Sequence, residues 1–172
     1  TTIPPLVAAA PTVTINQAAA QPDPTSASPI NFTVVFSEPV TGFTAAGVNL
    51  SGTAGATTKV VTGGPTTYNV AVSGMTSSGT VIANVPANAA TGTVNVIGNA
   101  TSTSTDNTVT FNLATSNDVC SGALPIACGQ TINGTTVGAT LDVVPTCVTT
   151  LSTGPSVWYT FVGDGQNTAL SL

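Results

Sequence analysis

The side chains that could do chemistry in this chain are few, and histidine is absent from its sequence. Lys59 is the single basic residue, and the six acids are Asp23, Glu38, Asp106, Asp118, Asp142 and Asp164. Nucleophilic catalysis needs a base beside a serine, threonine or cysteine, and glycoside hydrolysis needs two carboxylates facing one cleft. The spacing of the acids does not pair them, so we expect this segment to have no catalytic activity of its own.

The acids are also the candidate metal ligands, and calcium is the ion that carboxylate oxygens in loops would bind. The residues we select for such a site are Asp23, Glu38, Asp106 and Asp118, which fall near turns where the ends of a sandwich bring loops together. The alternative is that they are solvated turn acids, because the chain has no DxDxDG-like spacing. We predict no other cofactor.

The elements that must position these groups are built from a chain with very little charge. Charged residues make up 4% of the 172 residues, against roughly 25% in an average soluble protein. A net charge of −5 with one cation excludes a phosphate-binding surface, and with it a nucleic-acid partner. No apolar run approaches the roughly 20 residues of a membrane-spanning helix. This composition is typical of secreted, β-rich proteins.

Residues 29–40 carry the clearest strand pattern in the chain. Ile30, Phe32, Val34 and Phe36 alternate with other residues and so share one face of an extended strand. Because this strand holds two of the five phenylalanines, we predict that it lies at the centre of a β-sandwich.

Further short strands follow at intervals of about ten residues, separated by glycine and proline, as in sandwich folds. They are predicted at 13–15, 48–51, 57–61, 67–72, 80–85 and 108–113, with a bend at Gly42 and Gly47. In 57–61 Val60 is expected to face the core, so Lys59 should point to solvent rather than form an isopeptide crosslink. Residues 1–10 are predicted to be a linker or an edge strand that pairs with a neighbour.

Several segments of residues 11–113 match a known pattern. They are PTVTINQ, QPDPTSASPINFTVVFSEPVTGF, GVNLSGTAGA, TTYNVAVSGMTSSGTVIANVPANAA and STSTDNTVTFN. Together they resemble the bacterial Ig-like repeat domains of large surface proteins and adhesins, and FSEPVTGF and TDNTVTF are the most specific parts. The resemblance implies a seven-stranded Ig-like sandwich that is commonly repeated in tandem and commonly structural.

Residues 118–172 follow a joint at 114–117 and carry a second set of motifs. Asn117-Asp118, Cys128-Gly129 and VWYTF at 157–161 resemble the start of jelly-roll modules in secreted bacterial proteins, related to pre-peptidase C-terminal domains. The resemblance implies a partial jelly roll. Residues 157–162 are apolar on both faces, which predicts a central strand covered on both sides, and the turn at 163–165 leads into a further strand at 168–172. Trp158 and Tyr159 are expected in its core, with a sugar-binding platform as the alternative. We expect the chain to be an excerpt of a longer polypeptide.

Three cysteines, Cys120, Cys128 and Cys147, lie in this module. Without histidine or a CxxC pair, a disulfide in an oxidising compartment is favoured over a zinc site. The resembling modules carry further cysteines downstream, and Gly122 and Pro125 allow the chain between Cys120 and Cys128 to bend back. We predict a Cys120–Cys128 bridge with Cys147 pairing outside the chain; a Cys128–Cys147 bridge is the alternative.

The fold class predicted from these patterns is all-β, an Ig-like antiparallel β-sandwich at 11–113 followed by a partial jelly-roll β-sandwich. The function expected is structural, in an adhesin, stalk or extracellular filament at the bacterial cell surface. The partners expected are other copies or domains of the same protein, joined by β-strand addition through 1–10 or 169–172, and a surface glycan. The competing function is a non-catalytic accessory module of a secreted hydrolase, which binds a glycan or acts as a spacer.

Overall fold

The computed structural model describes residues 8–140 and 154–163 of the chain. Its internal contacts divide the chain into two units, Thr1–Asn112 and Leu113–Leu172, which we describe separately. The division falls next to residue 113, where the sequence predicted the end of the sandwich.

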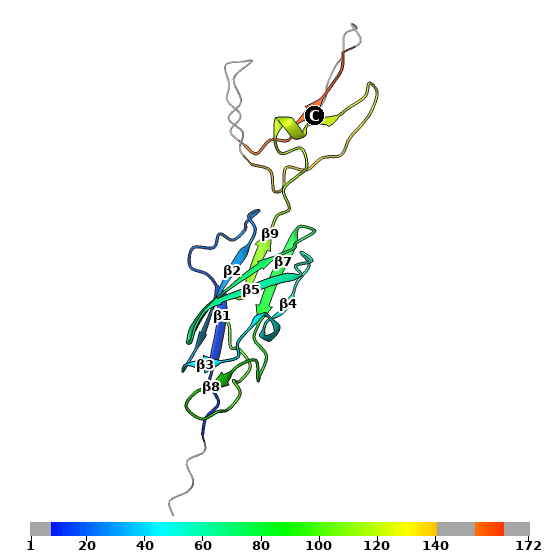
Figure 1. Cartoon of the computed structure of the whole chain (residues 1–172). Coiled ribbons are helices and arrows are strands. Elements are labelled where there is room, and N and C mark those ends of the chain that lie inside the picture. The colour runs from blue at the N-terminus through cyan, green and yellow to red at the C-terminus, as the bar shows by residue number, and fades with distance from the viewer. Residues whose placement is uncertain (1–7, 141–153, 164–172) are drawn as a thin grey trace, which may run out of the picture. The chain divides into compact units, whose positions relative to one another are not determined.

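The first unit is a sandwich of two antiparallel sheets (Figure 1). One sheet has the order β1-β2-β6-β5 and the other β4-β7-β9, while β3 and β8 form a short separate pair. The elements are β1 (Val13–Gln17), β2 (Ile30–Phe36), β3 (Val40–Thr41), the 3-10 turn η1 (Ala45–Gly47), β4 (Asn49–Ser51), β5 (Thr58–Gly63), β6 (Thr67–Ser73), β7 (Gly79–Asn84), β8 (Thr91–Gly92) and β9 (Thr108–Phe111). If the strands of the two sheets are lettered A to G in chain order, the sheets are ABED and CFG, the order of immunoglobulin constant-type domains. The predicted all-β sandwich is confirmed.

Strand β2 lies inside its sheet, as predicted, with β1 on one side and β6 on the other. Its inward side chains Ile30, Phe32 and Val34 are fully buried, and Phe36 is 3% exposed. The intervening residues Asn31, Thr33 and Val35 face outward because successive side chains of a strand alternate between the two faces. The alternation read from the sequence therefore gives the correct face of this strand.

Three aromatic rings close one end of the core. Phe36, Phe43 and Tyr68 pack edge to face, with ring centroids 5.0 to 5.9 Å apart. Phe43 lies in the bend predicted at Gly42 and Gly47. Gly42 has a φ of 79°, and a Cβ on Gly47 would lie 3.1 Å from the Ala89 Cβ and 3.2 Å from the Phe43 ring. The first glycine is required by backbone conformation and the second by close packing.

The face assigned to Lys59 from the sequence is wrong. Lys59 and Val61 are half-buried, whereas Val60 is 54% exposed. In the register of β5 against β6, Lys59 lies opposite Val72 and Val61 opposite Val70, both fully buried. Because residues directly opposite each other in a sheet point to the same face, Lys59 is on the core side of β5.

The described part of the second unit contains the 3-10 turn η2 (Cys120–Gly122) and the strands β10 (Leu124–Pro125) and β11 (Tyr159–Thr160). The two strands pair in parallel. The prediction of a covered central strand at 157–162 is wrong for the described residues, since both residues of β11 are exposed and Val162 is 90% exposed. The described residues give β11 one neighbour, β10, and no covering layer. The jelly roll stays a prediction, and the strand predicted at 168–172 lies outside the described residues.

Candidate functional site

Two of the predicted calcium ligands anchor loops to the sandwich. The Asp23 Oδ1 atom accepts a 2.9 Å hydrogen bond from the backbone N–H of Thr110 in β9. Asp106 acts through its backbone: its carbonyl accepts a 2.6 Å bond from the Gln17 N–H, and its own N–H donates to the Asn16 Oδ1 atom at 3.1 Å. Both aspartates are exposed, so their carboxylates remain hydrated.

The other two predicted ligands also have local roles. Both carboxylate oxygens of Asp118 bind Thr140, from its N–H at 2.5 Å and its hydroxyl at 3.0 Å. The Glu38 Oε1 atom is buried beside Gly92 without a hydrogen-bond partner among the described residues. Gly92 makes room for this oxygen, because a Cβ at this position would overlap it.

The four acids do not form a metal-binding group in the described structure. Across residues 8–140 and 154–163, no three His, Cys, Asp or Glu side chains are grouped closely enough to hold a metal ion. Calcium binding at Asp23, Glu38, Asp106 and Asp118 stays a prediction. Asp142 and Asp164 lie outside the described residues.

The cysteines are not bridged where the structure describes them. Cys120 begins η2 and Cys128 lies in the turn after β10, and both are exposed free thiols. The turn around Cys128 is closed by a 3.1 Å hydrogen bond from the Gln130 N–H to the Ala127 carbonyl. The Cys120–Cys128 disulfide stays a prediction, and Cys147 lies outside the described residues.

Asn117 organises the aromatic segment of the second unit. Its side chain is 5% exposed, its carbonyl accepts a 2.8 Å bond from the Trp158 N–H, and its Nδ2 donates to the Trp158 carbonyl at 3.0 Å. Trp158 is half-buried, whereas Tyr159 is 36% exposed. The expectation that both rings are core is therefore wrong for Tyr159, whose ring is available to solvent.

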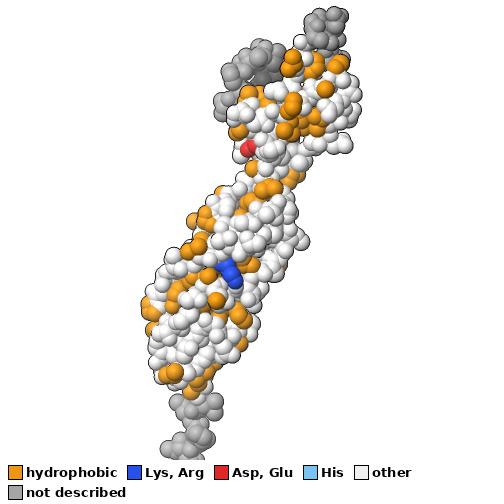
Figure 2. Space-filling model, turned by 45° about the vertical axis from the view of Figure 1, so that its right-hand side comes forward, with side chains coloured by type: hydrophobic (Ala, Val, Ile, Leu, Met, Phe, Trp, Pro, Cys, Tyr) orange, Lys and Arg blue, Asp and Glu red, His pale blue; other side chains and the backbone are white. Residues whose placement is uncertain are grey.

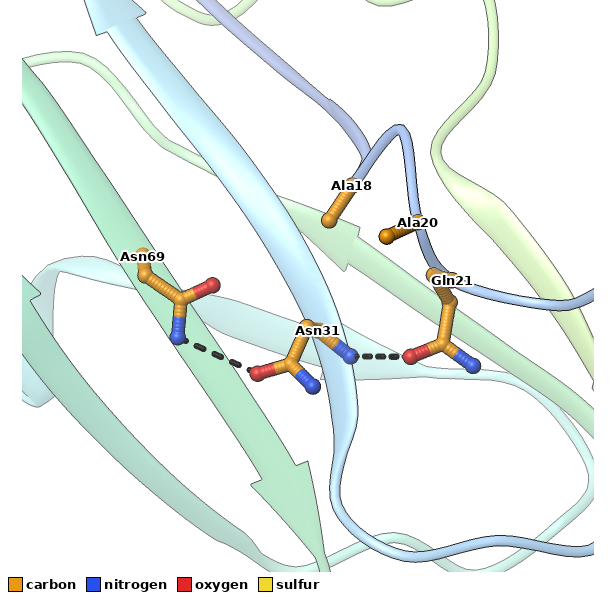
Figure 3. Close-up of a pocket in the computed structure, with 5 residues that line it drawn as sticks. All are labelled: Ala18, Ala20, Gln21, Asn31 and Asn69. Atoms are coloured by element: carbon orange, nitrogen blue, oxygen red, sulfur yellow. Dashed lines mark hydrogen bonds between the residues drawn. The ribbon is translucent and has the colours of Figure 1, made fainter.

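A shallow hollow of about 260 Å³ lies over the outer face of the first sheet (Figure 3). Its wall is uncharged and consists of Ala18, Ala20, Gln21, Asn31 and Asn69. The Asn69 Nδ2 donates to the Asn31 Oδ1 at 3.1 Å, and the Gln21 Oε1 accepts from the Asn31 N–H at 2.8 Å. Because these bonds already occupy part of the amide groups, the hollow offers few free polar atoms. This arrangement of Gln21, Asn31 and Asn69 was not predicted from the sequence.

The outer edge of β1 is covered by the segment 100–106. The Ala100 and Thr103 N–H groups donate to the carbonyls of Pro11 and Val13, at 2.9 and 3.0 Å. Further along, the Ile15 N–H donates to the Ser104 hydroxyl at 3.2 Å. The last contacts join Asp106 to Gln17 and Asn16, as described above. We call this set of hydrogen bonds between 11–17 and 100–106 the β1 clamp.

The segment 23–25 covers the outer edge of β9 in the second sheet. The Thr25 N–H donates to the Thr110 carbonyl at 3.0 Å, and the Thr25 carbonyl accepts from the Asn112 N–H at 2.8 Å. The Asp23 carboxylate accepts the N–H of Thr110. The backbone groups at this edge are thus satisfied within the chain, which removes a template for pairing with another strand.

Strand β5 forms the remaining edge of the four-stranded sheet, with β6 as its one described neighbour. Lys59 lies near its start, and its Nζ atom donates to the carbonyl of Val48 at the end of η1. Figure 2 shows this blue side chain on a surface that is otherwise white and orange around it. This edge of the four-stranded sheet, against which the described residues place no further strand, therefore carries the single cation of the sequence.

The chain matches no protein-family model, no curated protein and no solved structure in three comparisons. Among the described residues, no helix has both the length and the apolar composition needed to cross a membrane.

Proposed function

We propose that this chain is a structural segment of a secreted bacterial surface protein, in an adhesin, a stalk or an extracellular filament. In this role it transmits force and performs no catalysis of its own. The observation that carries the proposal is the β1 clamp, because of where it lies on the path between the two ends of the sandwich.

The geometry of the clamp suits a domain that is pulled from both ends. Residue numbers rise together along its two segments, so 11–17 and 100–106 run parallel. Strand β1 begins at the end of the sandwich near β3 and β8, and β9 ends at the opposite end (Figure 1). A force that draws these ends apart acts along the paired segments and loads their hydrogen bonds in shear, so that they must break together. The chain can therefore extend only after the hydrogen bonds of the clamp have broken.

The composition supports the same role. Packing one domain against the next removes few ions from water, because only 4% of residues are charged. As partners we propose other copies or domains of the same protein, joined by β-strand addition through 1–10 or 169–172, with β5 as the accepting edge. The setting we propose is the bacterial cell surface.

Single-molecule force spectroscopy on tandem copies of the chain tests the mechanical role. The double variant Asn16→Ala, Ser104→Ala removes the acceptors for three N–H groups of the clamp: Ile15, Thr105 and Asp106. We expect a lower unfolding force than in the wild type. The control is Ser77→Ala, which removes a hydroxyl hydrogen bond to Thr53 outside the clamp and should leave the force unchanged. Equal forces in all three proteins would contradict the proposal.

The second candidate function is a non-catalytic, glycan-binding module of a secreted hydrolase. The exposed Tyr159 ring favours it, because aromatic rings pack against sugar faces, and the shallow, uncharged hollow at Asn31 and Asn69 is a second place where a sugar could lie. Binding on a glycan array that Asn69→Ala or Tyr159→Ala abolishes would favour this function over the mechanical one.

A further inference from the structure

Lys59 occupies a position where a neutral apolar side chain would be expected. It lies on the core side of β5, opposite the fully buried Val72 and two residues from Val61. Lys59 is the single cation among 172 residues, and it is half-buried. A half-buried lysine loses part of its hydration, and here its ammonium donates to the Val48 carbonyl. The position calls for an explanation other than stability.

The hydrogen-bonding pattern of β5 shows which of its backbone groups point to the open edge, beside the charge of Lys59. The Gly64 N–H donates to the Thr67 carbonyl at 2.8 Å and closes the turn to β6. In an antiparallel ladder, hydrogen-bonded pairs alternate with non-bonded pairs, so Val60 and Thr62 bond to β6. Lys59 and Val61 therefore turn their N–H and C=O groups toward the open edge. This edge is a template on which a further strand could pair.

We propose that Lys59 prevents two copies of this chain from joining β5 to β5, and that the β5 edge is a latent self-association surface. In one antiparallel register that aligns the core sides of both copies, Lys59 of one copy lies opposite Val61 of the other. The two Lys59 residues are then diagonal neighbours, about 7–8 Å apart. Their like charges repel each other, and the added strand removes water from both ammonium groups.

This block is selective, because every other segment of the chain lacks a cation. A strand from another segment of this chain brings no second ammonium to the edge. Lys59 thus excludes β5-to-β5 pairing and leaves the edge accessible to a different strand. The inference does not depend on the proposed mechanical function, since it concerns only how this edge behaves between copies.

Analytical ultracentrifugation of the full chain in reducing buffer, up to about 1 mM protein, tests the proposal. Lys59→Met keeps the unbranched stem and removes the charge, and we expect it to add a dimerisation step that the wild type lacks. Lys59→Arg keeps the charge and should behave as the wild type. Adding Val61→Pro to Lys59→Met removes an N–H from the open edge and should abolish the new dimer. A Lys59→Met protein that associates no further than the wild type overturns the proposal, as does a dimer that persists in a folded double variant.

A mixing experiment tests the charge mechanism without the proline. Lys59→Glu alone carries like charges at the edge and should associate no further than the wild type. An equimolar mixture of Lys59→Glu and wild-type chains places opposite charges across the edge, and we expect it to form heterodimers. Circular dichroism first confirms that each variant is folded. A mixture that shows only the association of its separate components contradicts like-charge exclusion.

Discussion

At the scale of single residues, Asn99 shows how a nearly uncharged chain uses polar side chains as structural elements. It is 1% exposed, yet each of its side-chain groups is hydrogen-bonded. The Oδ1 atom accepts from the Ala90 N–H at 2.7 Å, and the Nδ2 group donates to the carbonyls of Pro86 and Ala100 at 2.9 and 2.7 Å. These bonds fix the ends of the loop between β7 and the β1 clamp. Burial of this amide also makes the N-x-T sequon at Asn99 inaccessible in the folded domain.

Replacing Asn99 should therefore cost more than its polar character suggests. We expect Asn99→Ala to lower the free energy of unfolding by about 3 kcal/mol, because it leaves buried backbone groups without partners. Urea denaturation followed by circular dichroism measures the change. Asn95→Ala, at an exposed position of the same loop, is the matched control and should change the stability by less than about 0.5 kcal/mol. Similar losses in both variants would show that the Asn99 network is not the cause.

At the scale of elements, β2 separates the contribution of the core from that of the strand itself. Phe32→Ala should lower the free energy of unfolding by about 3–5 kcal/mol, because it leaves a cavity between the sheets. Val35→Ala truncates a side chain that is 43% exposed on the opposite face of the same strand, and should cost less than about 1 kcal/mol. Thermal and urea denaturation of the two variants provide the comparison. Equal losses of unfolding free energy in the two variants would contradict the assignment of Phe32 to the buried face and Val35 to the exposed face.

The strands of the two larger sheets could be predicted from sequence because each carries its own local pattern, whereas the short pair β3 and β8 lies in segments that were not predicted as strands. The predicted range 67–72 and the observed β6 (Thr67–Ser73) differ by one residue. The prediction of which face of β5 points inward was wrong because Val60 and Val61 are adjacent. Alternation of apolar residues alone does not show which of the two faces the core. The hairpin between β5 and β6 could have given the correct face. If Gly64 pairs with Thr67 across the turn, then Lys59 pairs with Val72, which is an inward residue.

The β1 clamp could not be predicted in the same way. Its second segment, 100–106, is rich in serine and threonine and has no alternation of apolar and polar side chains. Its contacts join residues about 90 positions apart in the sequence. Such pairing depends on the assembled sandwich rather than on local propensity. The hollow at Asn31 and Asn69 was missed for the same reason, since it requires the register of β2 against β6. Local sequence thus indicates which strands form, and the fold determines which edges remain open.

At the scale of the whole molecule, stability has to come from apolar burial and neutral hydrogen bonds. Lys59 is the one basic side chain, so at most one side-chain ion pair to a lysine or arginine is possible. Its amine donates to a backbone carbonyl. The carboxylates of Asp23 and Asp118 accept hydrogen bonds from N–H and hydroxyl groups, and the Glu38 Oε1 atom is buried without a hydrogen-bond partner among the described residues. Neither burial nor neutral hydrogen bonding is screened by added monovalent salt in the way that surface ion pairs are.

We therefore expect the free energy of unfolding to change by less than about 1 kcal/mol between about 10 mM and about 500 mM NaCl. The residual effect should be a small gain, because salt screens the mutual repulsion of the acids in a chain of net charge −5. Urea denaturation across the salt series measures it, with NaCl chosen because sulfate strengthens apolar burial by itself. A large loss of stability with salt would reveal attractive charge pairs. A gain of several kcal/mol would show that the acids lie close enough together to repel strongly, and would direct attention back to a cation site among them.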